Sequence, residues 1–307
     1  MKRALARRLE PVLQVIEAPE PARPRRHLLP WPGRKAKLEA DAGRQLNLGA
    51  AILALSVLAD SGIEHYRGGF RNKAMFTPLV SASMALGASV FGVGDRRAQR
   101  HPARDAIYGL AAAVGLTGLG FHAYNVAKRP GGVSWQNLFY AAPIGAPAAL
   151  ALSGLLGRGA ELARDGHPRR TRILGGRAGR ALAGVAALGL AGTVGEAGLL
   201  HFRGAFQHPA MALPVTIPPA AAALLGARTL SSDPRLSQLT RWGLGLTALL
   251  GVAGAAFHAR GVSRSMGGWG NWRQNLLAGP PIPAPPSFTG LALAGLAALA
   301  LMEAAGD

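Results

Sequence analysis

The chain has 307 residues, a formal net charge of +19 and no cysteine. The absence of cysteine excludes disulfide bonds and thiolate metal sites. Charged residues make up only 16% of the chain, and long segments carry almost none, which argues against two ordinary soluble domains. Nucleic-acid binding would need the arginines on one folded surface with aromatic stacking partners. The basic residues here are instead divided among the segments between apolar stretches, so we expect no nucleic-acid partner.

The first 44 residues are basic and rich in proline and arginine. Apolar residues within 1–16 have a spacing that suits a helix lying on the membrane surface, although Pro11 interrupts the pattern. A partly ordered tail is an equally good interpretation. We expect residues 1–44 as a whole to form a cytoplasmic tail.

Eight apolar segments follow, each about the 20 residues that a helix needs to cross a bilayer. None of them has the polar stripe of an amphipathic helix in a soluble bundle. The segments are residues 46–65, 74–94, 106–126, 138–157, 182–202, 210–227, 242–259 and roughly 283–302. The sequence therefore predicts an all-α, polytopic integral membrane protein with eight transmembrane helices, whose first partner is the lipid bilayer.

One motif occurs twice in the chain. Residues 65–78 read HYRGGFRNKAMFTP, and residues 201–214 read HFRGAFQHPAMALP. The same offset of 136 residues carries Phe121-His122-Ala123 onto Phe257-His258-Ala259. An internal repeat of this length predicts that the protein is built from two similar units.

We place the first four-helix repeat at residues 45–158, a cytoplasmic linker at 159–180 and the second four-helix repeat at 181–307. Each repeat has an even number of spans, so both copies insert in the same orientation. Two such parallel repeats are related by an axis along the membrane normal.

The distribution of lysine and arginine predicts the orientation of the chain. The tail, the linker and the loops on their side of the membrane carry 25 of these residues, and the opposite face carries 9. By the positive-inside rule, both termini are cytoplasmic and the repeated motifs face outward. We expect a multi-pass protein of the cytoplasmic membrane.

Prolines interrupt several spans near this outer face. Pro143 and Pro147 lie in the fourth span, Pro214 lies in the sixth, and residues 280–286 are dense in proline. A proline in a span frees a backbone carbonyl, which is tolerated only where protein or a polar cavity satisfies it. We therefore expect a broken or extended segment before the last span.

Four histidines fall at the outward ends of odd-numbered spans and so share one depth. Two acids occupy equivalent positions in the two repeats, about 7 Å deeper by helical rise. An acid within a membrane span is a functional candidate by default. The histidines are His65, His122, His201 and His258, and the acids are Asp60 and Glu196.

A bound redox centre is one hypothesis for these residues, because neutral imidazole is a common ligand of metals and haem iron. Within each repeat, the histidines of the first and third spans would face each other around haem b or a transition metal. Arg67 and Arg203 would then pair with haem propionates or another anion. This interpretation predicts an electron-transfer component with a periplasmic redox partner.

Other interpretations remain open. The histidines equally fit a structural role in which they hydrogen-bond loop backbone and lock the outer turns. The protein as a whole also fits a non-catalytic membrane anchor for a periplasmic protein, or a small-solute transporter with two parallel repeats. The sequence contains no hydrolase-like nucleophile and base, and it leaves open whether the protein is an enzyme.

Overall fold

The computed structural model describes residues 34–165, 172–173 and 176–305, and most of these residues are helical. The predicted tail over residues 1–33 and much of the predicted linker, at 166–171 and 174–175, lie outside the described residues. In chain order the elements are α2 (Arg34–Arg67), η1 (Lys73–Phe76), α3 (Thr77–Gly94), α4 (Pro102–Ala127), α5 (Trp135–Tyr140), α6 (Gly145–Arg164), β1 (Arg172–Ile173), β2 (Gly176–Arg177), α7 (Ala178–Arg203), η2 (Pro209–Val215), α8 (Ile217–Arg228), α9 (Pro234–Arg264), η3 (Gly268–Asn271), α10 (Trp272–Ala278) and α11 (Pro286–Ala304). The strands β1 and β2 form a minimal antiparallel pair in which Arg172 faces Arg177.

Within the described part of the chain, seven helical segments are long and apolar enough to cross a membrane. Each overlaps one predicted span, so the prediction of an all-α, multi-pass membrane protein is confirmed. The seven segments are Lys37–Arg67, Lys73–Gly94, Pro102–Ala127, Ala178–Arg203, Pro209–Arg228, Pro234–Arg264 and Pro286–Ala304.

The predicted fourth span, residues 138–157, is not among these seven segments. The chain there forms α5, a non-helical stretch over 141–144 and then α6. The last two turns of α6 carry Arg158, Glu161 and Arg164, which lower its apolar character. This helix therefore begins and ends later along the chain than the sequence predicted.

One further boundary differs from the prediction. α2 begins at Arg34, so residues 34–44, which we expected to belong to the tail, are continuous with the helix of the first span. The reason is burial, because Ala40, Ala42 and Leu46 all lie within the protein. The helix is thus held by packing beyond its apolar segment.

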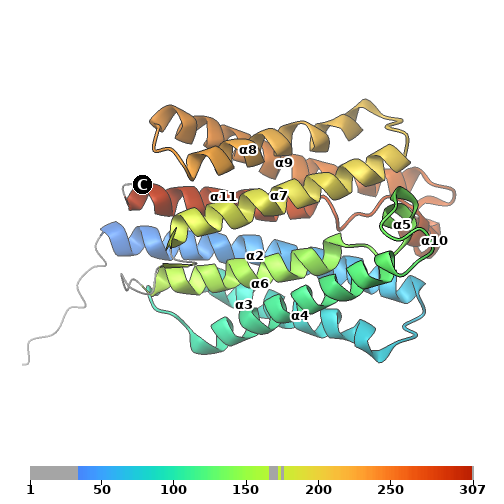
Figure 1. Cartoon of the computed structure of the whole chain (residues 1–307), viewed down its shortest axis with the longest axis horizontal. Coiled ribbons are helices and arrows are strands. Elements are labelled where there is room, and N and C mark those ends of the chain that lie inside the picture. Colours follow the sequence, from blue (N-terminus) through green and yellow to red (C-terminus); the bar gives the residue numbers. More distant parts are fainter. Residues whose placement is uncertain (1–33, 166–171, 174–175, 306–307) are drawn as a thin grey trace, which may run out of the picture. The chain divides into compact units, whose positions relative to one another are not determined.

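Four helices occupy the middle of the bundle, namely α2, α6, α7 and α11 (Figure 1). α2 packs against α3, α6 and α11, whereas α7 packs against α8 and α11 and makes fewer contacts with α6. α3 and α4 cover one side of these inner helices, and α8 and α9 cover the opposite side. The two sequence halves therefore meet along the inner helices.

Small residues allow the helices to approach closely. A Cβ added to Gly49 of α2 would lie 2.6 Å from the carbonyl oxygen of Gly290 in α11. A Cβ on Gly115 of α4 would lie 2.3 Å from the backbone nitrogen of Ala151 in α6. In lipid, where apolar burial between helices gains little, such close packing is a main source of helix association.

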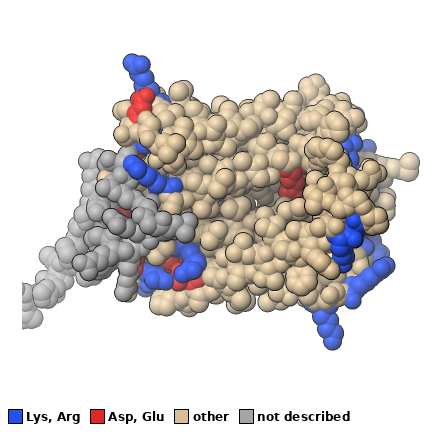
Figure 2. Space-filling view, viewed as in Figure 1, with Lys and Arg blue, Asp and Glu red and all other residues tan. Residues whose placement is uncertain are grey.

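Charged side chains gather at the two ends of the helices, and the middle of the face shown in Figure 2 carries few of them. We call this middle zone the apolar belt, because the helical segments that form it are apolar. This pattern is typical of a protein whose belt lies in hydrocarbon and whose ends lie in water. The ends of α2, α4, α7 and α9 reach the end of the bundle that carries α5 and α10. The predicted site residues lie toward this end.

Candidate functional site

The two copies of the repeated motif form the same hairpin. The Nδ1 atom of His65 lies 2.6 Å from the carbonyl oxygen of Met75. The Nδ1 atom of His201 lies 2.8 Å from the carbonyl oxygen of Met211. These bonds tie the end of α2 to η1 and the end of α7 to η2.

Both hairpins reverse through a phenylalanine in the left-handed region. Phe70 has φ of 45° and Phe206 has φ of 46°, a conformation that costs a non-glycine residue about 1–3 kcal/mol. The amide of Phe70 donates a 3.0 Å hydrogen bond to the carbonyl of His65. The amide of Phe206 donates a bond of the same length to the carbonyl of His201. The surrounding bonds thus hold the same strained turn in both halves.

The other two histidines bond to carbonyls in the breaks before α6 and α11. His122, near the end of α4, bonds through Nδ1 to the carbonyl oxygen of Pro143. His258 of α9 bonds through Nδ1 to the carbonyl oxygen of Pro281 at 2.7 Å. The imidazoles therefore satisfy backbone groups that the proline-rich breaks leave without a helical partner.

These bonds determine which ring nitrogen carries the hydrogen. A carbonyl oxygen only accepts, so each Nδ1 donates, and the neutral ring keeps its lone pair on Nε2. His201 and His258 are close enough to interact electrostatically. No group of three or more His, Cys, Asp or Glu side chains among the described residues has a geometry that suits a metal ion.

The two arginines of the motif reach across to the opposite half. Arg67 donates to the carbonyl oxygen of Leu277 in α10 and forms an ion pair with Glu64 at 3.3 Å. The guanidinium of Arg203 lies 4.6 Å from the ring centroid of Tyr140 in α5. Each arginine thus joins the end of an inner helix to the short outer helix of the other half.

The two intramembrane acids lie on the inner helices α2 and α7, one from each half of the chain. Glu196 of α7 and Asp60 of α2 are close enough to interact electrostatically. Glu64 and Arg67, one and two turns further along α2, also act electrostatically on Asp60. Figure 2 shows acidic atoms at the edge of a hollow inside the apolar belt, away from both charged ends.

Glu196 also lies against the first residue of α6. Its carboxylate lies beside the backbone of Gly145 and acts on it electrostatically. A Cβ on Gly145 would lie 1.7 Å from Glu196 Oε2, so the carboxylate occupies the space of a side chain. The residue equivalent to Gly145 before α11 is Pro283, which has no amide hydrogen to offer Asp60. The two acids therefore differ in their surroundings.

A second polar cluster lies at the other end of the bundle, where sequence reasoning placed no site. Arg104 of α4 pairs with Glu161 of α6 at 2.8 Å and with Asp95 at 2.9 Å. Arg164 of α6 is fully buried and donates to the carbonyl oxygens of Asp95 and Gly92, both at 2.7 Å. This network fixes the connection between α3 and α4.

The network belongs to the first half alone. The second-half positions that correspond to Arg104, Glu161 and Arg164 are Thr240, Leu299 and Met302. The signal in the sequence is that these three charged residues of the first half align with uncharged residues in the second half. The sequence-based account missed it because it assigned Glu161 and Arg164 to a linker.

Asp95 remains ionised within this network. The hydrogen bond from the Arg97 side chain, assisted by Arg104, holds the pKa of the Asp95 carboxyl well below its usual range. Burial acts in the opposite direction but is the weaker effect. The carboxylate therefore keeps its charge, and its pairing with the arginines, at neutral pH.

Comparisons of the chain with protein-family models, with curated proteins and with solved structures find no significant match.

Proposed function

We propose that the chain crosses the membrane eight times as two parallel four-helix repeats, residues 45–158 and 181–307, with both termini in the cytoplasm. Equivalent hydrogen bonds from His65 and His201, and the equivalent turns at Phe70 and Phe206, support the duplication. In this arrangement α6 is the fourth span in chain order and brings the total to eight, and its charged last turns lie at the cytoplasmic end.

We further propose that the protein transports protons or small cations and binds them at the Asp60–Glu196 pair. One observation carries this proposal. Asp60 and Glu196 occupy equivalent positions in two candidate membrane spans, and Asp60 acts electrostatically on Glu196.

The chemistry of the pair supports this function. Two carboxylates near each other repel, so the pair is stabilised when a proton or a cation binds between them. The positive end of the α6 dipole, beside Glu196, is a favourable place for an anionic group. Ionisable groups within membrane spans commonly mark ion pathways and proton relays. Parallel repeats with broken helices are also a recurrent transporter architecture.

Flux measurements on the full chain in liposomes test this proposal. An imposed pH or sodium gradient should decay faster than in empty liposomes, and Asp60→Asn or Glu196→Gln should lower the rate at least tenfold. Glu303→Gln, which alters an exposed acid at the opposite end, serves as the matched control. Flux equal to that of empty liposomes, or unchanged in both variants, would refute the proposed function.

A second candidate is an electron-transfer component that binds haem b or a transition metal through His65, His122, His201 and His258. One observation favours it. All four Nδ1 atoms are bonded to backbone carbonyls, which leaves Nε2 free in the manner of a ligating histidine. Arg67 and Arg203, expected beside propionates, contact protein groups instead, and this weighs against the candidate.

Absorbance and elemental analysis decide this second candidate. Protein purified from membranes should show a Soret band that changes on dithionite reduction, or stoichiometric copper, iron or zinc. His65→Ala and His201→Ala should then lose the bound group while the bundle stays folded. Colourless, metal-free protein would leave no basis for a periplasmic redox partner.

A further inference from the structure

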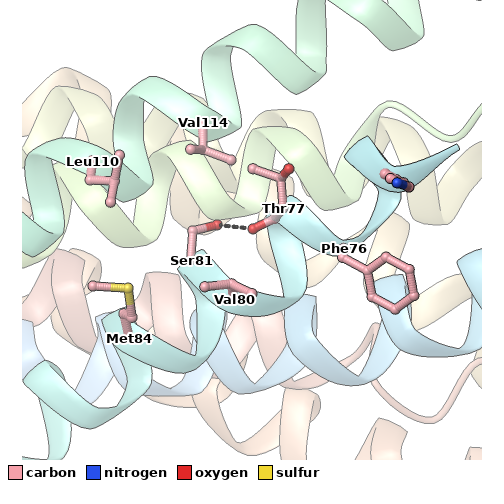
Figure 3. A pocket seen from close by; sticks show the side chains of 8 residues that line it. Phe76, Thr77, Val80, Ser81, Met84, Leu110 and Val114 are labelled. Carbon is pink, nitrogen blue, oxygen red and sulfur yellow. Dashed lines mark hydrogen bonds between the residues drawn. The ribbon is translucent and has the colours of Figure 1, made fainter.

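An apolar groove of about 300 Å³ lies between α3 and α4 (Figure 3). It starts beside η1, at the end of the bundle that carries the repeated hairpins, and continues between the two helices. Its main lining residues are Lys73 and Phe76 of η1, Val80 and Met84 of α3, and Leu110 and Val114 of α4.

Apart from Lys73 at its end, the groove is lined mainly by apolar side chains. The hydroxyl of Ser81 donates to the carbonyl oxygen of Thr77 in its own helix at 2.9 Å, as the dashed line in Figure 3 shows. The apolar lining is nevertheless exposed, since Val80 has 60% of its surface accessible and Leu110 has 49%. A hydrocarbon chain suits such a groove within the apolar belt.

The groove runs along part of one leaflet. Seven residues separate Thr77 from Met84 along α3, a rise of about 10 Å. The hydrocarbon of one leaflet is about 15 Å thick. An acyl chain that enters beside η1 therefore ends near the middle of the bilayer.

The side chain of Lys73 lies at the end of the groove where the headgroup of such a lipid would lie. Lys73 begins η1 and lines the groove, and no carboxylate in the described residues forms an ion pair with it. The turn that presents it is ordered, because Asn72 caps η1 by accepting a 2.9 Å hydrogen bond from the amide of Ala74. Phe76 stacks on Phe70 with ring centroids 4.4 Å apart, which fixes the mouth of the groove.

We propose that this groove binds one anionic phospholipid, with an acyl chain between α3 and α4 and its phosphate paired with Lys73. The site belongs to the first half only, because the positions that correspond to Lys73 and Val80 in the second half are Pro209 and Thr216. The site is independent of the acid pair, so its failure would leave the transport proposal intact.

Native mass spectrometry of the full chain tests this site with two lipids of identical acyl chains, phosphatidylglycerol and phosphatidylcholine. The wild-type protein should retain at least one phosphatidylglycerol with about tenfold preference. Lys73→Ala should abolish the preference, and Leu110→Trp, which fills the groove, should reduce retention of both lipids. Size-exclusion chromatography and circular dichroism confirm that each variant is folded.

Two variants in the second half serve as matched controls. Arg260→Ala removes a cation from the same end of the bundle, and Thr216→Trp adds bulk at the position that corresponds to Val80. Both should retain lipid as the wild type does. Unchanged preference in Lys73→Ala, or an equal loss in Arg260→Ala, would overturn the assignment of the headgroup to Lys73.

Discussion

At the scale of single residues, one interaction recurs four times. A histidine near the C-terminal end of a long helix donates from Nδ1 to a carbonyl in the segment that follows. The bond serves the same purpose in each place, because it satisfies backbone that no regular helix pairs. Each histidine ring therefore has a structural role through its Nδ1 bond, independent of what its Nε2 atom binds.

Replacing one of these histidines should weaken the fold without destroying it. His65→Ala and His201→Ala each remove one hydrogen bond, and a typical net hydrogen bond stabilises a protein by about 1 kcal/mol. Unfolding in mixed detergent micelles should show that the free energy of unfolding falls by about 1 kcal/mol in either variant. Gln207→Ala, an exposed change in the same hairpin, should have no measurable effect; equal losses for all three would show that the ties are unimportant.

At the scale of elements, close glycine contacts set which helices touch. Gly49 and Gly290 let α2 and α11 approach until backbone meets backbone. The position that corresponds to Gly49 in α7 is Val185, and α7 makes fewer contacts with α6 than α2 makes with α11. The more open interface is the one beside Glu196 and the start of α6.

Two glycine substitutions separate packing from helix propensity. Gly49→Ala places a Cβ 2.6 Å from a carbonyl oxygen, and such overpacking typically costs about 1–3 kcal/mol. Gly184→Ala, in the corresponding inner helix α7, meets no atom within 4 Å and should be neutral or slightly stabilising. Thermal unfolding in detergent measures both, and equal behaviour would contradict the tight contact of α2 with α11.

The ion pairs of Arg104 with Glu161 and Asp95 allow a test that compares a single with a double substitution. Glu161→Gln leaves Arg104 buried without its closest carboxylate, and breaking one side of a buried pair costs about 3–5 kcal/mol. Arg104→Thr with Glu161→Leu installs the residues of the second half and should cost less than Glu161→Gln alone. A double variant that is less stable than Glu161→Gln would mean that the network stabilises the first half beyond its pairing.

At the scale of the whole molecule, the sequence predicted more of the helices than of their contacts. The length of the apolar segments predicted the spans, because the thickness of the hydrocarbon core sets how long such a segment must be. The sequence pattern does not say which helices pack together. The contacts of Arg67 with α10 and of Arg203 with α5 were therefore not predicted. Their positions in the sequence predicted that Asp60 and Glu196 lie at the same depth, and the sequence did not predict that Asp60 acts electrostatically on Glu196.

The charged cluster was missed for a related reason. Arg158, Glu161 and Arg164 lower the hydropathy of the last turns of α6, so these turns resemble a linker. In the fold they pair with Arg104 and Asp105 of α4 or with backbone between α3 and α4. Charged side chains that form ion pairs with a neighbouring helix are compatible with a continuous helix. A hydropathy profile does not show such ion pairs.

Infrared spectroscopy of the carboxyl groups tests most directly whether Asp60 and Glu196 form one proton-binding or cation-binding pair. Because neighbouring carboxylates repel, we predict a protonated carboxyl band near neutral pH in the absence of added cations. The band should shift in D2O and should change in Asp60→Asn and in Glu196→Gln but not in Glu303→Gln. A spectrum without such a band between pH 5 and pH 8, or a band that neither substitution alters, would contradict the account.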